Sequence, residues 1–128
     1  MDKEFLAGML KTTGKLDIII DDGSHIPLHN IESFKFLFPF LNSGGYYIVE
    51  DTLSSYSPYY HKEHGHNGNF LNFAKNLTDY VNYRAEAPFL PDQYEMIKNQ
   101  LSPDSLSSIV QELEFVRFYE QLVIIKKK

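Results

Sequence analysis

The segment Leu16-Asp-Ile-Ile-Ile-Asp-Asp-Gly-Ser-His25 decides the fold of this chain. Its apolar run, residues 16–20, follows Gly14 and ends in two aspartates and a glycine. A continuous apolar run, rather than an alternating one, is typical of a strand buried on both faces, as in a parallel sheet. We therefore predict a buried strand over residues 16–20, with acidic side chains at its carboxyl end.

A helix and a second strand are expected next. Apolar residues recur at three- and four-residue spacing from Ile31 to Leu41, and Pro27 suits the first turn of a helix. Residues 42–45, Asn-Ser-Gly-Gly, should stop that helix. The following apolar run, Tyr46–Val49, again ends in acids. Strand, helix and strand with short connections predict a βαβ unit.

The rest of the chain predicts a helix and a hairpin. Residues 52–69 are polar, aromatic and glycine-containing, which indicates a long loop, and residues 70–81 carry apolar side chains at helical spacing. A proline-rich stretch follows, with a short helical insertion expected around residues 94–97. The apolar runs 113–119 and 122–125 are separated by only two residues, so we predict an antiparallel hairpin. A βαβ unit, a helix and a closing hairpin make an α/β sheet.

Composition narrows the class of protein. The chain has 128 residues, enough for one domain, and a net charge of −5 without a basic stripe, which argues against nucleic-acid binding. It contains no cysteine, so disulfides and thiolate-bound zinc are excluded. No apolar run reaches the ~18–20 residues of a membrane span, and the first residues lack a secretory signal. We expect a cytoplasmic protein that does not contact membranes.

Both predicted parallel strands end in carboxylates. Neighbouring strands lie ~4.8 Å apart, so Asp22 should face Glu50 and Asp51 across a gap that suits a hard cation such as Mg²⁺. His25 follows Asp22 by three residues, and an imidazole there can accept a proton from a hydroxyl acidified by the metal. Each acidic pair alone is more often a solvated turn. Their combination with the histidine favours a functional site.

Other histidines and tyrosines are weaker candidates. His29 lies one helical turn beyond His25, and we interpret it as a packing residue rather than a catalytic one. Tyr56, Tyr59 and Tyr60 follow the acidic pair and could stack on a sugar or simply cover the core. We take Tyr56 as the substrate-binding candidate. His61, His64 and His66 have a spacing that suggests zinc, but a solvated loop is the better interpretation of so glycine-rich a segment.

These residues together resemble the macrocin/mycinamicin family of sugar O-methyltransferases. The resemblance is close between residues 16 and 56 and looser at the hairpin. It is carried by the following residues: Asp17 to His25, His29, Ser33-Phe34, Leu37-Phe38-Pro39, Gly44-Gly45-Tyr46 and Val49-Glu50-Asp51.

The resemblance implies a function and roles for particular residues. Asp22, Glu50 and Asp51 match the family's metal ligands, and His25 matches the general base. The implied reaction is Mg²⁺-dependent transfer of a methyl group from S-adenosylmethionine to a sugar hydroxyl of a glycoside or polysaccharide. The implied fold is the C-terminal half of a Rossmann-like class I methyltransferase sheet.

The family's cofactor-binding front half has no counterpart here. No Gly-x-Gly-x-x-Gly pattern is present, and only about fifteen residues precede the first strand, so the residues that bind the cofactor are unknown. We expect residues 1–128 to be one partial methyltransferase domain whose N-terminal cofactor-binding strands are absent. An Ile-rich edge at residues 16–20 would then be open to pairing, with a second copy or with a separately encoded N-terminal half.

Two other interpretations stay open. The chain could be a non-catalytic, truncated remnant or interaction module that keeps the metal-site residues without a cofactor site. It could also be a metal enzyme of another reaction class, such as a hydroxylase, although Fe(II) would favour more histidine ligands.

Overall fold

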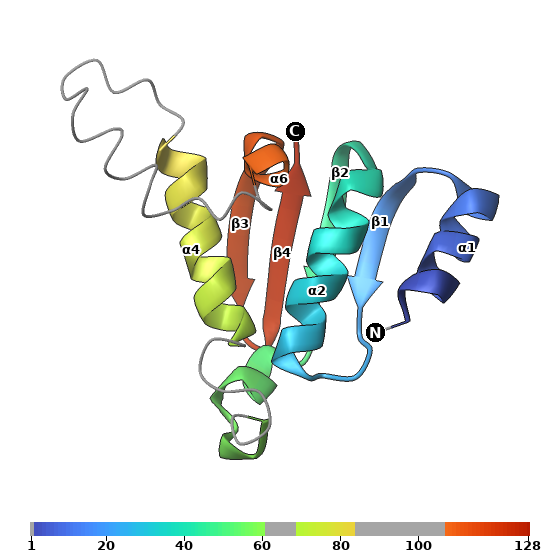
Figure 1. Cartoon of the computed structure of the whole chain (residues 1–128). Helices are drawn as coiled ribbons and strands as arrows, with labels where there is room; N and C mark the ends of the chain where they lie inside the picture. The colour runs from blue at the N-terminus through green and yellow to red at the C-terminus, as the bar shows by residue number, and fades with distance from the viewer. Residues whose placement is uncertain (1, 61–68, 84–106) are drawn as a thin grey trace.

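The computed structural model describes residues 2–60, 69–83 and 107–128 (Figure 1). The predicted helical insertion near residues 94–97 and the histidines at 61, 64 and 66 lie outside these ranges. The described elements follow one another along the chain as α1 (Lys3–Thr13), β1 (Leu16–Asp21), α2 (Pro27–Leu37), η1 (Phe38–Phe40), β2 (Leu41–Val49), η2 (Thr52–Tyr56), α4 (Phe70–Tyr83), α6 (Ser107–Gln111), β3 (Leu113–Tyr119) and β4 (Leu122–Lys127).

The strands form one mixed sheet in the order β1-β2-β4-β3. β1 and β2 are parallel, whereas β4 runs antiparallel to both β2 and β3. The predicted βαβ unit and hairpin are therefore confirmed. Figure 1 shows that the carboxyl ends of β1 and β2, the segment η2 and the β3–β4 turn all lie at the same end of the sheet.

The boundary between α2 and β2 differs from the prediction. The helix ends at Leu37 and a 3-10 turn containing Pro39 follows, because proline lacks the backbone donor that a continuing helix needs. β2 then begins at Leu41, five residues earlier than predicted. Residues 42–45 form an irregularity in the strand, since Leu16 pairs with Leu41 but Ile18 pairs with Tyr46.

Helix α1 was not predicted from the sequence, although its boundaries have clear signals. The Asp2 side chain accepts a hydrogen bond from the backbone nitrogen of Phe5 at 2.9 Å, which caps the first turn. Gly14 ends the helix with a φ of 72°, a conformation that glycine adopts without strain. The helix buries Leu10 in the core.

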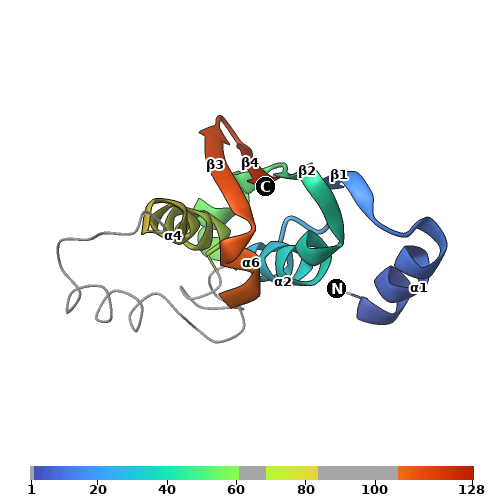
Figure 2. The same ribbon diagram turned by 90° about the horizontal axis from the view of Figure 1, so that it is seen from above.

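The core lies between one face of the sheet and the helices. In Figure 2 the described helices all lie on the same side of the sheet. Phe34 of α2 stands at the centre of this layer, fully buried, with ring centroids 4.9 Å from Phe38, 5.3 Å from Tyr47 and 5.7 Å from Phe73. Close packing of this kind fixes α2, and therefore the loop that leads into it, against β2.

The prediction that β1 is buried on both faces is wrong, because the face of the sheet opposite the helices is open. Ile19 faces the core and is 8% exposed, but Ile18 and Ile20 are 59% and 58% exposed. On this open face, Lys126 lies over the rings of Tyr46 and Phe115 at the β4–β3 side. Ile18 and Ile20 therefore leave uncovered apolar surface on β1. None of the helices in the described ranges is long and apolar enough to cross a membrane.

Candidate metal and acceptor site

The candidate site begins where β1 and β2 end. The backbone nitrogen of Glu50 donates to the carbonyl oxygen of Asp21 at 3.1 Å, so the two strands stay paired as far as their acidic ends. Asp22 follows directly on β1, and Asp51 follows Glu50. The predicted meeting of these two strand ends is confirmed by the parallel register.

Three of the predicted side chains come together. Ligand atoms of Asp22, His25 and Asp51 all lie within 4.8 Å of one another. The Nε2 atom of His25 is 3.7 Å from Oδ2 of Asp51. Glu50 is not part of this group, so its assignment as a ligand stays a prediction, as do the roles of the other three. The group has two carboxylates and one imidazole within reach of a single point.

Backbone strain is concentrated at the same place. Among the described residues other than glycine, positive φ angles occur at His25 (54°), Asp51 (52°) and Gln121 (57°). These three residues come from three separate segments, yet all line one open hollow of about 360 Å³. We call it the metal-side hollow; Leu53, Ser54 and Tyr60 also line it. Strained non-glycine residues tend to gather at functional sites, because the surrounding fold must hold them there.

A partly buried hydrogen-bond network around Asp21 supports the loop before α2. The hydroxyl of Tyr47 donates to Oδ2 of Asp21 at 3.1 Å, and Gly23 and Asn30 also donate to this carboxylate. Burial raises the pKa of Asp21, and these hydrogen bonds act against the increase. Burial also raises the pKa of Tyr47 far above its ordinary value, so its hydroxyl stays protonated and available as a donor.

His29 serves the same loop. Its Nδ1 atom lies 2.9 Å from the hydroxyl of Ser24, within hydrogen-bonding distance. This contact agrees with the interpretation of His29 as a packing residue that supports the loop rather than a catalytic group. His25, by contrast, faces the metal-side hollow, and its Nδ1 atom is buried without a hydrogen-bond partner among the described residues.

The donor set suits a hard cation. Carboxylate oxygens are the ligands that Mg²⁺ prefers, and a bound Mg²⁺ usually keeps several waters, so an open hollow with two carboxylates fits it. A mononuclear Fe(II) site of the oxygenase type would instead use two histidines and one carboxylate. The described group contains the reverse ratio, and this favours the Mg²⁺ prediction over the hydroxylase alternative.

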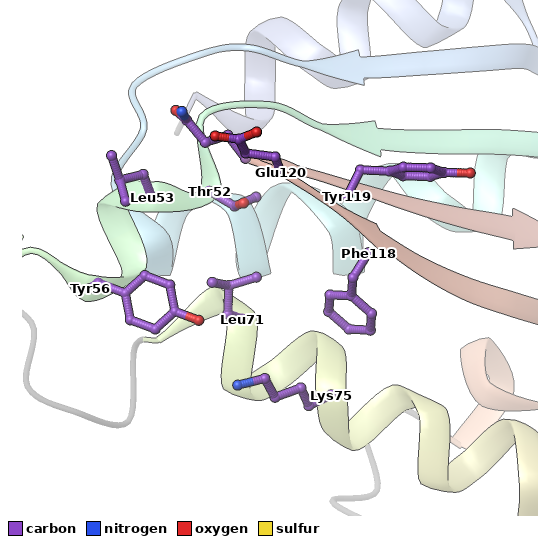
Figure 3. A pocket seen from close by; sticks show the side chains of 9 residues that line it. Thr52, Leu53, Tyr56, Leu71, Lys75, Phe118, Tyr119 and Glu120 are labelled. Carbon is purple, nitrogen blue, oxygen red and sulfur yellow. The ribbon is translucent and has the colours of Figure 1, made fainter.

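The tyrosines are distributed over two hollows. Tyr60 lines the metal-side hollow. Tyr56 lines a neighbouring hollow of about 580 Å³ (Figure 3), which we call the outer hollow. Leu53 and Gln121 line both hollows. Gln121 was missed by the sequence analysis, because its only signal was its place in a two-residue hairpin turn.

Fold and site together define a mixed α/β sheet with an acidic group at the carboxyl ends of its parallel strands. The fold is similar to part of a solved methyltransferase, MycE from the mycinamycin biosynthetic pathway, in complex with Mg and SAH. The TM-score is 0.74 at 30% identity, and the match covers 98% of this chain but 30% of that one. A second MycE structure also contains mycinamycin VI and matches with a TM-score of 0.72 at 26% identity.

The resemblance to sugar O-methyltransferases is confirmed as a partial match. The chain is 42% identical over 86 residues to L-olivosyl-oleandolide 3-O-methyltransferase of Streptomyces antibioticus, which covers 64% of this chain. It is 37% identical over 95 residues to mycinamicin VI 2''-O-methyltransferase of Micromonospora griseorubida, which covers 72% of this chain. The chain spans only 22% and 24% of the length of these two relatives. No family model matches the chain.

Proposed function

We propose that residues 1–128 form part of a Mg²⁺-dependent O-methyltransferase that transfers a methyl group from S-adenosylmethionine to a sugar hydroxyl of a glycoside or polysaccharide. The observation that carries the proposal is the group of Asp22, His25 and Asp51 within 4.8 Å. The partial match to glycoside O-methyltransferases supports it. The methyl donor is proposed from the resemblance alone, since no residue here is assigned to the cofactor.

The roles of the residues follow from their chemistry. Asp22 and Asp51, with Glu50 as the third predicted ligand, would hold the cation through carboxylate oxygens. When bound, Mg²⁺ lowers the pKa of an acceptor hydroxyl and orients it. His25 accepts the proton from that hydroxyl through its imidazole. The packed α2 and the Asp21–Tyr47 hydrogen bond keep the loop in place, so the base needs little rearrangement before the proton moves.

Calorimetric titration of the chain with MgCl₂ tests the metal site. We expect saturable binding, and we expect Asp51→Ala or Asp22→Ala to weaken the Mg²⁺ affinity by at least about tenfold. Removing a residue that only hydrogen-bonds to a metal ligand already costs about that much affinity. Asp79→Ala is the matched control, because it removes one exposed carboxylate from α4. Circular dichroism of each variant checks that the fold persists. Equal Mg²⁺ binding by all variants would reject the site.

Titration with S-adenosylmethionine, with and without Mg²⁺, tests the cofactor assignment. Binding at micromolar affinity would support a cofactor site completed within this chain or by a homo-oligomer. Absence of binding by a folded sample would favour the second candidate function, a non-catalytic remnant or interaction module. A separately encoded N-terminal half would restore binding only on mixing.

The second candidate function rests on a separate observation. Ile18 and Ile20 expose more than half of their surfaces on the open face of β1. An uncovered apolar strand of this kind is a surface for another polypeptide segment. This candidate needs no cation, so it predicts that Ile18 and Ile20, but not Asp22 and Asp51, are required for binding a partner.

A further inference from the structure

His25 presents one of its two ring nitrogens to the metal-side hollow. Its Nδ1 atom is buried and has no hydrogen-bond partner among the described residues. Its Nε2 atom lies 3.7 Å from Oδ2 of Asp51, and the side chain as a whole keeps 35% of its surface exposed. Because His25 lines the hollow, Nε2 is the nitrogen that is available to a cation there.

Nε2 and the two carboxylates have a spacing that also suits a four-coordinate cation. Ligand atoms of Asp22, His25 and Asp51 lie within 4.8 Å of one another. A tetrahedral Zn²⁺, with bonds of about 2.0–2.2 Å to nitrogen and oxygen, has ligand atoms about 3.3–3.6 Å apart. The 3.7 Å between His25 and Asp51 is already close to this separation. Modest side-chain rotations therefore bring the three ligands to one such ion, and the open hollow leaves room for water as the fourth.

Mg²⁺ and Zn²⁺ make different use of an imidazole beside two carboxylates. Mg²⁺ takes oxygen ligands and keeps several waters, so carboxylates hold it while a neighbouring imidazole stays free. Zn²⁺ takes imidazole nitrogen as readily as carboxylate oxygen. A Zn²⁺ ion on all three groups occupies the lone pair of Nε2 of His25. That lone pair is the one that accepts a proton in the proposed function.

We propose that Zn²⁺ inhibits this site by binding His25 as a ligand together with Asp22 and Asp51. The inference rests on the proposed function, because inhibition follows only if His25 is the base. The two cations compete, since both use Asp22 and Asp51. His25 distinguishes them: it stays free beside Mg²⁺ and becomes a ligand of Zn²⁺.

The experiment needs a chain without other zinc-binding histidines. The protein has five histidines and no cysteine. His61, His64 and His66 have a spacing that suggests zinc, so all three are replaced by alanine in the 128-residue chain. This background variant keeps His25 and His29, and His29 does not line the metal-side hollow.

Calorimetric titration of the background variant with ZnCl₂ and with MgCl₂ tests the ligand set. We expect His25→Ala to weaken the Zn²⁺ affinity by at least about tenfold and to leave the Mg²⁺ affinity within about twofold. Asp51→Ala should weaken the binding of both cations. His29→Asn is the matched control, because it removes the other imidazole and keeps a hydrogen-bonding group near Ser24. Equal Zn²⁺ affinity with and without the imidazole of His25 would overturn the proposal.

Imidazole NMR gives a second measurement that needs neither a substitution at His25 nor enzymatic activity. The ¹⁵N-labelled background variant is titrated at about pH 7.5, where an ordinary histidine is mostly neutral. Zn²⁺ should shift the Nε2 resonance of His25, and saturating Mg²⁺ should leave it nearly unchanged. The ring of His29 should respond to neither cation. The absence of a Zn²⁺-dependent shift at His25 would contradict the proposal even if His25→Ala fails to fold.

The same titrations separate this inference from the proposed function. In an enzyme completed by its missing half, Zn²⁺ should lower methyl transfer, and excess Mg²⁺ should restore it. If the proposed function fails, Mg²⁺ binding does not depend on Asp51; Zn²⁺ bound through His25 then supports the ligand set but overturns the inhibition. If only the inference fails, Mg²⁺ binding still depends on Asp51, and the Zn²⁺ affinity is the same with or without His25.

Discussion

Asp21 is the residue that joins the interior of the protein to the candidate site. It is the last residue of β1, directly before Asp22, and its carboxylate is held by Tyr47 from the core and by Gly23 in the loop. A buried carboxylate costs free energy unless it is hydrogen-bonded. The hydrogen bonds to Asp21 offset this cost, and they also fix the position of the loop that carries Asp22 and His25.

The pKa of Asp21 predicts a pH dependence of stability. Burial raises the folded-state pKa above the ordinary 3.8, so the folded state binds this proton more tightly than the unfolded chain does. The resulting stabilisation is complete below the unfolded pKa and is lost as pH rises through the folded pKa. The Asp21→Asn variant has no ionisable group at this position, so its stability does not fall in this way as pH rises.

Thermal melts in chelator measure this effect. We expect the Tm difference, Asp21→Asn minus wild type, to be more positive at about pH 7 than at about pH 3.5. A difference that does not change with pH, or one that changes in the opposite direction, would show that burial does not dominate at Asp21.

His25→Ala separates the two roles open to this imidazole. If His25 is the base and not a ligand, Mg²⁺ affinity should stay within about twofold, while methyl transfer by the completed enzyme falls by about 10²–10⁴-fold, the usual contribution of a positioned base. Calorimetry and a methyl-transfer assay measure the two quantities. A loss of Mg²⁺ affinity similar to that of Asp51→Ala would identify His25 as a ligand instead.

At the residue scale, the sequence predicted part of the site. Asp22, His25 and Asp51 could be brought together because parallel strands end at the same edge of a sheet. Gln121 could not be predicted, because its place beside them depends on β4 lying next to β2, a long-range pairing with no local signal. The separation of Tyr56 from Tyr60 into two hollows likewise depends on tertiary packing.

At the scale of elements, the pairing of β1 with β2 depends on Gly45. A Cβ atom at this position would lie 2.9 Å from the carbonyl oxygens of both Asn42 and Asp17. Both contacts are with backbone, which cannot move without disturbing the strand pair. A side chain is therefore excluded where residues 42–45 depart from the regular strand.

Gly45→Ala should consequently lower the free energy of unfolding by about 1–3 kcal/mol, the usual cost of overpacking. Gly8→Ala is the matched control, because Gly8 lies within α1 and a Cβ there meets nothing within 4 Å. It should stabilise the protein by up to about 1 kcal/mol through helix propensity. Urea denaturation of both variants measures the contrast, and similar effects in both would contradict the steric argument.

The elements themselves were predicted better than their ends. Apolar spacing located α2, α4 and both hairpin strands, since these patterns report which face is buried. The spacing extended the predicted helix α2 through Pro39, because Phe38 and Leu41 continue the helical pattern. Both side chains are indeed buried, but Phe38 belongs to the 3-10 turn η1 and Leu41 to the strand β2. The short α1 was missed because it buries only Leu10.

For the whole molecule, the uncovered face of β1 is the main departure from the prediction. A continuous run of isoleucines was expected to be buried on both sides, but the described helices cover one side only (Figure 2). Ile18 and Ile20 therefore leave an apolar surface that must be solvated or covered by another segment.

Ile18→Lys tests whether this surface drives association between copies. We expect the wild type to sediment partly as oligomers and the variant to shift toward monomer, because a charge on a flat strand opposes pairing. Phe5→Lys is the matched control, being 68% exposed on α1. Analytical ultracentrifugation measures the distribution, and a purely monomeric wild type would rule out self-association through β1.

His25, Asp51 and Gln121 at the metal-side hollow all have left-handed backbone conformations, which glycine would adopt with less strain. Substitutions that increase stability at these positions would therefore remove side chains from the candidate site. Replacing Gln121 by glycine would relieve backbone strain of about 1–2 kcal/mol, partly offset by the greater freedom of the unfolded chain. The same argument applies, with smaller gains, at His25 and Asp51, where these residue types tolerate the conformation better. Selection of variants for heat resistance alone would therefore favour glycine at all three positions. Such variants would become more stable while they lost the proposed metal ligand Asp51, the proposed base His25 and a third side chain that lines the same hollow.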